Sequence, residues 1–248
     1  MSTHTNVAQV ALVTGASRGL GREIARLLAR QGTRLILTAR GADALQAVAD
    51  ELSAHTEVVA LSGDVSDPTH AARLVRQGIH RFGQIDVLVN NASTIGPSPM
   101  PTLDAYPPAA LAEVFAVNTV APLHLIQLVL PGMRARGEGV IVNVTSDAAV
   151  EAYPGWGGYG ASKAALEHLS RVLAAELDGS GIRVYTVDPG DMNTEMHRDA
   201  EPGVDLSHLP GPEVSAPAIV RVIQTGTEPF GRFEAQLPEP ALARGRSR

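Results

Sequence analysis

The sequence predicts an α/β fold in which strands and helices alternate along one domain. Short apolar runs of strand length, such as residues 139–145, are followed by stretches in which apolar residues recur every three to four positions. A glycine-rich turn joins the first run to the first amphipathic stretch, and polar residues follow several other runs. Because α/β folds of this length are commonly single domains, we expect one domain over residues 1–237.

The composition excludes several classes of function. The formal net charge is -6 at pH 7, so we expect no basic surface for nucleic acid. The chain has no cysteine, which excludes disulfides, thiol catalysis and cysteine-ligated metal, and its 8 histidines show no metal-ligand spacing. The first residues carry no charged-then-apolar leader, and no apolar run reaches about 18 residues. A soluble cytoplasmic protein without a membrane or metal partner is therefore expected.

The first strand, expected at residues 7–14, runs directly into the glycine turn of residues 15–21. The apolar positions Leu20, Ile24 and Leu28 mark a helix that follows at once. Glycines let a backbone approach a pyrophosphate, and a helix amino terminus faces its charge. The spacing Gly-x-x-x-Gly-x-Gly differs from the common Gly-x-Gly-x-x-Gly fingerprint. The context predicts a phosphate-binding turn, with a plain strand-to-helix turn as the alternative.

The end of the second strand, residues 33–38, indicates which dinucleotide fits. A carboxylate at this place accepts from the ribose 2′-hydroxyl of NAD, whereas an arginine suits the 2′-phosphate of NADP. Here the strand leads into Ala39-Arg40, and Arg18 of the glycine turn lies within reach of the same place. Two guanidiniums and no carboxylate favour NADP(H). The alternative is two solvated arginines.

Polar residues follow the third and fourth strands, expected at residues 58–61 and 85–89. Asp64 either accepts from an adenine amino group or caps the turn before a helix that begins near Pro68. Asn90-Asn91-Ala92-Ser93 either lines the cofactor or satisfies loop backbone. The proline-rich residues 93–108 are expected to form a loop beside the site.

A helix over residues 109–130 contains Asn118 and, four residues later, Pro122. Because proline has no N–H, the carbonyl of Asn118 lacks its helical donor. We hypothesise that this carbonyl holds a water linked to Lys163, which supplies a proton route to Tyr159. The alternative is an incidental kink.

Tyr159 and Lys163 are the central pair of this interpretation. The apolar pattern after Lys163 predicts a helix that begins near Tyr159, and residues four apart share a helix face. An ammonium about 4 Å from a phenol, at an effective dielectric near 20, favours the phenolate by roughly 4 kcal/mol, or about three pKa units before desolvation. Tyr159 is therefore expected to act as a general acid/base, with Ser146 beside it at the end of strand 139–145.

The last quarter of the chain is less regular. A strand over residues 182–187 ends at Asp188-Pro189-Gly190, and residues 191–213 are expected to form a lid or long loop. A short helix at 216–223 and a short strand at 232–237 follow. Residues 238–248 are expected to be a flexible, solvated basic tail.

Several separated motifs occur in the order typical of one enzyme family: Thr14-Gly15-x-x-x-Gly19-x-Gly21, Asn90-Asn91-Ala92, Asn118, Ser146, Tyr159-x-x-x-Lys163 and Pro189-Gly190. Together they resemble the short-chain dehydrogenase/reductase family of standard length. The resemblance implies a single Rossmann-like domain with a doubly wound parallel sheet of about seven strands. Two features depart from it: Ser93 replaces the usual glycine after Ala92, and the carboxyl terminus lacks a glycine-rich strand ending.

The resemblance also implies roles for individual residues. Tyr159 exchanges the proton, Ser146 positions the substrate oxygen, Lys163 binds ribose and lowers the tyrosine pKa, and Asn118 anchors the relay water. The residues implied for pyrophosphate and 2′-phosphate are Gly15, Ser17, Arg18, Gly19, Leu20 and Gly21. Those implied for the rest of the cofactor are Arg40, Asp64, Val65, Asn91, Ala92, Pro189, Gly190 and Thr194. A homodimer or homotetramer through the helices bearing Asn118 and Lys163 is implied as well.

These observations together predict an NADP(H)-dependent carbonyl reductase or alcohol dehydrogenase. The expected pocket walls are the loop after Ser93, the loop with Tyr153 and Trp156, and the lid with its methionines and His197. Their rings and methionines suggest a partly apolar or ring-bearing substrate. The alternatives are a non-catalytic NADP-sensing or scaffold protein of the same fold, and another reductase chemistry on the same cofactor.

Overall fold

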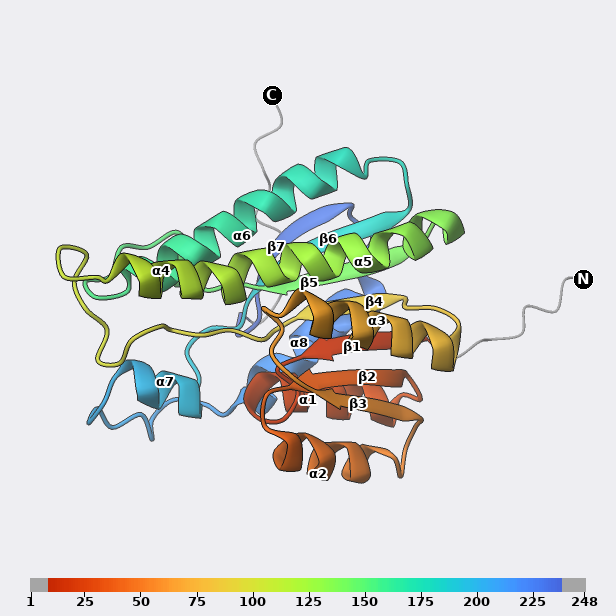
Figure 1. Ribbon diagram of the computed structural model, residues 1–248, viewed down its shortest axis with the longest axis horizontal. Helices are drawn as coiled ribbons and strands as arrows, with labels where there is room; N and C mark the ends of the chain where they lie inside the picture. The colour runs from red at the N-terminus through yellow and green to blue at the C-terminus, as the bar shows by residue number, and fades with distance from the viewer. Residues whose placement is uncertain (1–8, 238–248) are drawn as a thin grey trace, which may run out of the picture.

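The computed structural model describes residues 9–237, which form a three-layer α/β fold around one sheet (Figure 1). The seven strands are β1 (Val10–Thr14), β2 (Arg34–Ala39), β3 (Val58–Ser62), β4 (Val87–Asn90), β5 (Gly139–Val144), β6 (Ile182–Asp188) and β7 (Phe230–Glu234). Their order is β3-β2-β1-β4-β5-β6-β7, and every neighbouring pair is parallel. This Rossmann-like doubly wound sheet confirms the predicted fold class. The expected tail, 238–248, lies outside the described residues.

Helices cover both faces of the sheet. On one side lie α1 (Gly19–Arg30), α2 (Ala42–Leu52) and α8 (Pro212–Thr225). On the other lie α3 (Pro68–Phe82), α4 (Pro108–Phe115), α5 (Ala121–Arg136) and α6 (Gly157–Glu176). Each layer buries its own apolar cluster against the sheet. The five inner strands are almost entirely buried because parallel sheets are covered on both faces, whereas the edge strands β3 and β7 are partly exposed.

The strand order reverses between β1 and β4, because β1 leads to β2 on one side while β4 lies on the other. In open α/β sheets a ligand binds at such a switch point, outside the carboxyl ends of the strands. The glycine turn, Asn91 and Ser146 all follow strands at this edge. The topology therefore gathers residues that are far apart in the sequence.

The expected single helix over 109–130 is interrupted by a π-helical turn, η1 (Ala116–Val120), which leads into α5. Pro122 cannot donate, and the N–H of Ala121 bonds back five residues to the carbonyl of Ala116. This correction to the predicted helix has a physical cause, since a missing donor favours a wider turn. A π-turn of this kind often marks a functional site.

The joined segment Pro108–Arg136 has an 18-residue window of mean hydropathy 1.6, so by length and composition alone it could cross a membrane. Half of that window is buried inside the fold, as expected for the core helix of a globular protein. Polar residues such as Asn118 and Thr119 interrupt it and are themselves buried.

The expected lid over 191–213 is not wholly irregular. It contains α7 (Glu195–Ala200), in which the N–H of His197 is capped by the side-chain hydroxyl of Thr194. A helix of 6 residues is too short to leave a periodic apolar pattern, which is why the sequence did not indicate it. In Figure 1, α7 projects beyond the sheet on the left, next to the carboxyl ends of the strands.

Two glycines, on helices that cover one face of the sheet, allow a matched test of stability. A Cβ on Gly78 of α3 would lie 2.1 Å from Cδ1 of the fully buried Ile36, whereas one on the exposed Gly132 of α5 would meet only the end of Arg136, at 3.4 Å. Gly78→Ala is therefore expected to lower the free energy of unfolding by about 1–3 kcal/mol through overpacking. Gly132→Ala is expected to raise it by about 0.5–1 kcal/mol through helix propensity. Urea denaturation measures both, and equal effects at the two positions would contradict the packing argument.

Candidate active site

The glycine turn leaves bare backbone where a phosphate would approach. Gly15 has φ +66°, and a Cβ there would lie 2.8 Å from Nδ2 of Asn91. A Cβ on Gly21 would lie 2.4 Å from the carbonyl oxygen of Gly15. The helix α1 begins at Gly19, so its free N–H groups face the same space. The residues present fit a dinucleotide pyrophosphate.

Asn91 and Ala92 secure this turn from the neighbouring strand. Both of their N–H groups donate to Oγ1 of Thr14 at 2.9 Å, and Nδ2 of Asn91 donates to the carbonyl of Thr14 at 2.9 Å. The side chain of Asn91 thus satisfies loop backbone, the alternative that the sequence left open. A direct contact of Asn91 and Ala92 with a cofactor stays a prediction.

The ends of β2 and β3 bring Arg40 and Asp64 to the same edge of the sheet. Oδ1 of Asp64 accepts from the N–H and hydroxyl of Ser66, so the carboxylate holds the turn before α3. Burial raises the pKa of Asp64, but the bonds from Ser66 and the charge of Arg40 outweigh it and leave the pKa below its ordinary value. Arg40 is exposed and Val65 is buried. The turn-capping alternative for Asp64 is confirmed, and its adenine contact stays a prediction.

The lid meets the glycine turn. Arg18 forms an ion pair with Glu195 at the start of α7, and both side chains are more than half exposed. A Cβ on Gly19 would lie 3.9 Å from Cγ2 of Thr194. The two predicted 2′-phosphate ligands thus differ. Arg40 is exposed at the end of β2, whereas Arg18 forms an ion pair with an acidic residue of the lid.

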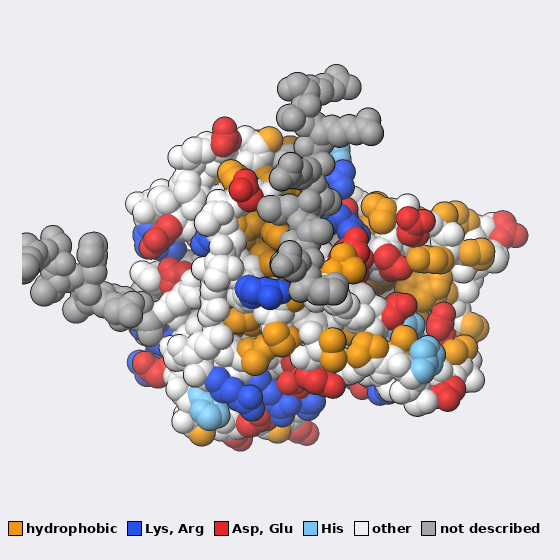
Figure 2. All heavy atoms as spheres, turned by 180° about the vertical axis from the view of Figure 1, so that it is seen from behind, with side chains coloured by type: hydrophobic (Ala, Val, Ile, Leu, Met, Phe, Trp, Pro, Cys, Tyr) orange, Lys and Arg blue, Asp and Glu red, His pale blue; other side chains and the backbone are white. Residues whose placement is uncertain are grey.

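A cavity of about 460 Å³ opens between the end of the sheet and the lid. All three predicted walls contribute to it: Ile95 from the proline-rich loop, Tyr153 and Trp156, and Met192, Met196 and His197 from the lid. Of the predicted site residues, Ser146, Tyr159, Pro189, Gly190 and Thr194 line it. Figure 2 shows the opposite face, where apolar side chains mix with acidic ones over the region of the lid, on the right of the view.

Tyr159 and Lys163 lie one helical turn apart on α6, as predicted. Nζ of Lys163 is 5.5 Å from the centre of the Tyr159 ring and donates to the carbonyl of Val144 at 2.8 Å. Trp156 packs edge-on against the same ring at a centroid distance of 5.7 Å. Lys163 is only 2% exposed and Tyr159 9%. The pair is thus removed from water, with the amine bound to backbone.

The predicted lowering of the Tyr159 pKa by Lys163 is wrong. Burial raises the pKa of the phenol above its usual range, the carboxylates of Asp188 and Asp147 add to this, and the hydroxyls of Ser146 and Ser93 oppose it. Burial also lowers the pKa of Lys163 to about 8, while the charge of Asp188 raises it. The sequence argument used an effective dielectric of about 20 and left out the energy of desolvation. The loss of hydration of the buried phenolate reverses the direction of the pKa shift.

Ser146 follows β5 and points its hydroxyl at the same region. Its Oγ donates to Oδ1 of Asp147 at 2.8 Å and accepts from the N–H of Ala148 at 3.2 Å. Oδ2 of Asp147 in turn accepts from Tyr153, which raises the pKa of that phenol to about 12. Asp147 therefore orients the serine and a wall of the cavity, a role that sequence reasoning did not assign.

Asn118 is fully buried and all of its amide is used by protein groups. Its Oδ1 accepts from the N–H of Thr94 at 2.8 Å and from Oγ of Ser93 at 3.0 Å. Its Nδ2 donates to the carbonyl of Thr94 and to Oγ of Ser162 on α6. The side chain thus ties the loop after β4 to α6, while the proposed relay through its backbone carbonyl stays a prediction.

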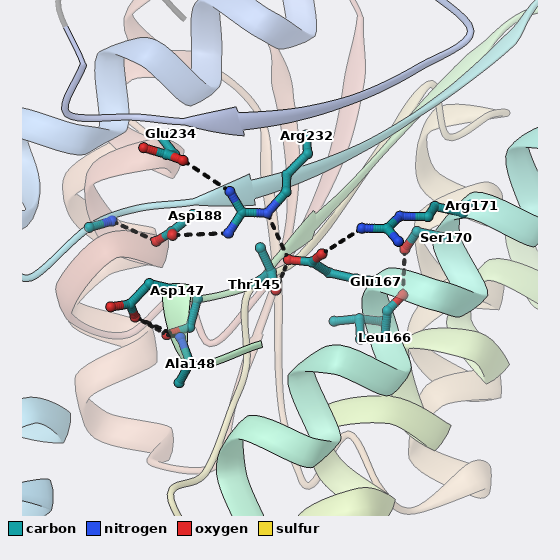
Figure 3. Close-up of polar contacts among 12 residues, drawn as sticks. Thr145, Asp147, Ala148, Leu166, Glu167, Ser170, Arg171, Asp188, Arg232 and Glu234 are labelled. Atoms are coloured by element: carbon teal, nitrogen blue, oxygen red, sulfur yellow. Dashed lines mark hydrogen bonds and ion pairs between the residues drawn. The ribbon is translucent and has the colours of Figure 1, made fainter. Parts of the chain in front are cut away.

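A buried network of charges lies beside these residues, and sequence reasoning missed it. Figure 3 shows Arg232 of β7 directed at Glu167 of α6 and Asp188 of β6. Asp188 also lines the cavity. The family motifs end near Thr194, so they could not indicate Arg232. A lone arginine in a short strand also carries no sequence signal of its own. Within residues 9–237, no group of three or more histidine and carboxylate side chains is placed to hold a metal ion.

Comparison with known proteins agrees with this fold. The family described as short chain dehydrogenase matches residues 9–205. The chain is 37% identical over 195 residues to a rhamnolipids biosynthesis 3-oxoacyl-[acyl-carrier-protein] reductase from Pseudomonas aeruginosa, covering 77% of this chain and 75% of that protein. It is also 37% identical over 199 residues to a glycine betaine reductase from Emericella nidulans, covering 78% of this chain but only 15% of that longer protein.

Solved structures are similar over most of the chain. A putative short chain dehydrogenase from Pseudomonas syringae has a TM-score of 0.85 and 29% identity, covering 95% of this chain and 98% of that chain. A metagenomic short-chain oxidoreductase in complex with NADP has a TM-score of 0.70 and 36% identity, covering 75% and 85%. This chain belongs to the short-chain dehydrogenase/reductase family. Members of this family are oxidoreductases that use nicotinamide cofactors and act on small molecules.

The chain contains a single lysine, Lys163, so its titration can be followed directly. In protein labelled with ¹³Cε-lysine, NMR should give one side-chain signal with a midpoint near 8, because burial lowers its pKa to about 8. In urea the same signal should titrate near about 10.4, the ordinary value, which is the control. A folded-state midpoint near the ordinary value would contradict the buried site.

Proposed function

We propose that this protein is an NADP(H)-dependent oxidoreductase that interconverts a carbonyl and an alcohol. The observation that carries the proposal is the Tyr159 phenol in the cavity wall, with the Lys163 amine behind its ring and the Ser146 hydroxyl in the same wall. A proton donor and an oxygen-positioning hydroxyl in one cavity wall, with a buried cation behind them, are what carbonyl reduction needs from protein groups.

In the proposed reaction the bound nicotinamide supplies or accepts the hydride. Tyr159 gives its proton to the carbonyl oxygen as an alkoxide develops, and its raised pKa keeps it protonated at neutral pH. Ser146 holds the same oxygen by a hydrogen bond. Lys163, with the lowered pKa of about 8, binds the nicotinamide ribose and places a positive charge behind the forming phenolate. Water held by the Asn118 carbonyl returns the proton.

The cofactor preference for NADP(H) rests on Arg40 and Arg18 at the edge of the glycine turn. Two arginines and no carboxylate at the end of β2 suit a 2′-phosphate. Similar solved structures are complexed with NADP and with 5-hydroxy-NADP, which supports the same choice. The remaining cofactor contacts are assigned to the glycine turn, Asp64 and Val65, Asn91 and Ala92, and the Pro189–Gly190 and Thr194 stretch.

The substrate is proposed to be a partly apolar carbonyl compound, reduced rather than oxidised in the cell. Trp156, Met192 and Met196 in the cavity wall support an apolar or ring-bearing group. Relatives carry the names of a 3-oxoacyl-[acyl-carrier-protein] reductase, a 1-deoxy-11-beta-hydroxypentalenate dehydrogenase and a 7alpha-hydroxysteroid dehydrogenase. A cytoplasmic homodimer or homotetramer through α5 and α6 completes the proposal.

Tyr159→Phe tests the proton donor. Loss of a positioned general acid should lower kcat by about 10²–10⁴-fold while NADPH binding is unchanged. Tyr185→Phe is the matched control, because its buried hydroxyl donates to the carbonyl of Glu228, away from the cavity. That variant should keep its turnover and lose only about 1 kcal/mol of stability.

The turnover assay uses a panel of ketones and aldehydes with NADPH oxidation as the readout. Full activity of Tyr159→Phe would refute the mechanism. NADPH binding without turnover of any carbonyl would instead favour the non-catalytic sensor.

Arg40→Ala tests the cofactor preference. Loss of a charge-assisted bond to the 2′-phosphate should weaken NADPH binding by about 10-fold or more and leave NADH binding unchanged. Arg134→Ala, at the exposed end of α5, removes an equal charge elsewhere and is the control. Equal affinities of the unaltered protein for NADPH and NADH, measured by fluorescence titration, would exclude the preference.

A further inference from the structure

Arg232 joins three elements of the active site from the far end of the chain. Its Nε donates to Oε1 of Glu167 at 3.0 Å and its Nη2 to Oδ2 of Asp188 at 3.3 Å, while Nη1 reaches Glu234 at 3.2 Å (Figure 3). The side chains of Arg232, Glu167 and Asp188 are only 13%, 4% and 7% exposed. Glu234 is half exposed and forms the outer arm of the network.

The two buried partners of Arg232 each lie close in the chain to residues of the proposed site. Glu167 lies four residues after Lys163 on α6, and its Oε1 also accepts from Thr145, the residue before Ser146. Oδ1 of Asp188 accepts from the N–H of Gly190, so the carboxylate also shapes the turn after β6. One guanidinium therefore links β5, α6 and β6 at the point where each leads into the site.

Stability alone does not account for this network. Burying charges costs hydration, and replacing a buried ion pair by apolar side chains is often neutral or stabilising. A fixed carboxylate that lines the same cavity as Tyr159 has a chemical consequence, however. The charge of Asp188 raises the pKa of both Lys163 and Tyr159, and so favours the ammonium together with the neutral phenol.

We propose that Arg232 is a positioning residue that fixes the Asp188 carboxylate beside the Lys163–Tyr159 pair and thereby sets the protonation state of that pair. The inference deepens the proposed reductase function and rests on it. The charged groups around Asp188 are Arg232 and Glu234 from β7, Asp147 after β5, and Lys163 with Tyr159 from α6. Burial raises the pKa of Asp188 above its ordinary value, and the N–H of Gly190 and the guanidinium of Arg232 oppose that rise.

The test uses the single-lysine NMR titration, which needs neither substrate nor cofactor. Asp188→Asn should lower the Lys163 midpoint by about one unit, because a neighbouring opposite charge favours the ammonium. Arg232→Gln should also shift the Lys163 midpoint. In the double variant with Asp188→Asn, adding Arg232→Gln should cause no further shift, because the carboxylate through which Arg232 acts is already absent. Arg232→Lys keeps a cation at this position but adds a second lysine signal, so the signal of Lys163 is identified as the one that disappears when Lys163→Arg is added. Its midpoint should return close to the unaltered value. Glu234→Gln, on the exposed arm, is the control and should have no measurable effect.

Two results would overturn the inference: an unchanged midpoint in Asp188→Asn, or an Arg232→Gln shift of equal size in both backgrounds. If Arg232→Gln alone fails to fold, Arg232→Gln combined with Glu167→Gln removes the cation with one of its carboxylates and serves in its place. The basic limb of the pH profile of carbonyl reduction should follow the NMR midpoint in every variant. A protein that titrates as expected but reduces no carbonyl would refute the proposed function and leave the charge network standing.

Discussion

The active site depends on the removal of one lysine and one tyrosine from water. Lys163 is held by the carbonyl of Val144 and packed behind the ring of Tyr159, which Trp156 covers from another side. Loss of hydration destabilises each charged form, so the Lys163 ammonium becomes a stronger acid and the Tyr159 phenol a weaker one. The neighbouring polar groups shift the pKa of Tyr159 further, in both directions. Ser146 and Ser93 favour the phenolate, while Asp147 and Asp188 favour the phenol.

Much of the fold was predictable because its signals are local. Each strand from β1 to β6 begins or ends within about two residues of its predicted bounds, since apolar runs between turns mark buried parallel strands. The cavity walls were predictable for a related reason. Loops that follow neighbouring parallel strands must meet at one edge of the sheet. The sequence therefore predicts Tyr153, Trp156 and Met196 close to Tyr159, and all four line the cavity.

What the sequence could not indicate depends on long-range contacts and on burial. The sign of the Tyr159 pKa shift requires knowing that the phenol is enclosed, which spacing along a helix does not show. The partners of Asn91 and Asn118 were equally hidden, because an amide can bind loop backbone or a ligand with the same groups. Arg232 follows Glu167 by 65 residues along the chain, and no short motif connects two charges that meet only in the folded sheet.

Ser93 illustrates how one departure from the family pattern changes the site. A glycine at this position would leave Oδ1 of Asn118 with the N–H of Thr94 as its donor, whereas the serine hydroxyl adds a second bond at 3.0 Å. Ser93 also lowers the pKa of the Tyr159 phenol. The side chain of Asn118 therefore binds a residue that acts on the phenol, while a link from its backbone carbonyl to Tyr159 stays a prediction. Because the amide of Asn118 also binds Ser162 on α6, this path holds the loop after β4 and the helix of Tyr159 in one hydrogen-bonded unit. The position of Tyr159, the proposed proton donor, thus depends on the strand ends on both sides of the switch point, and not on α6 alone.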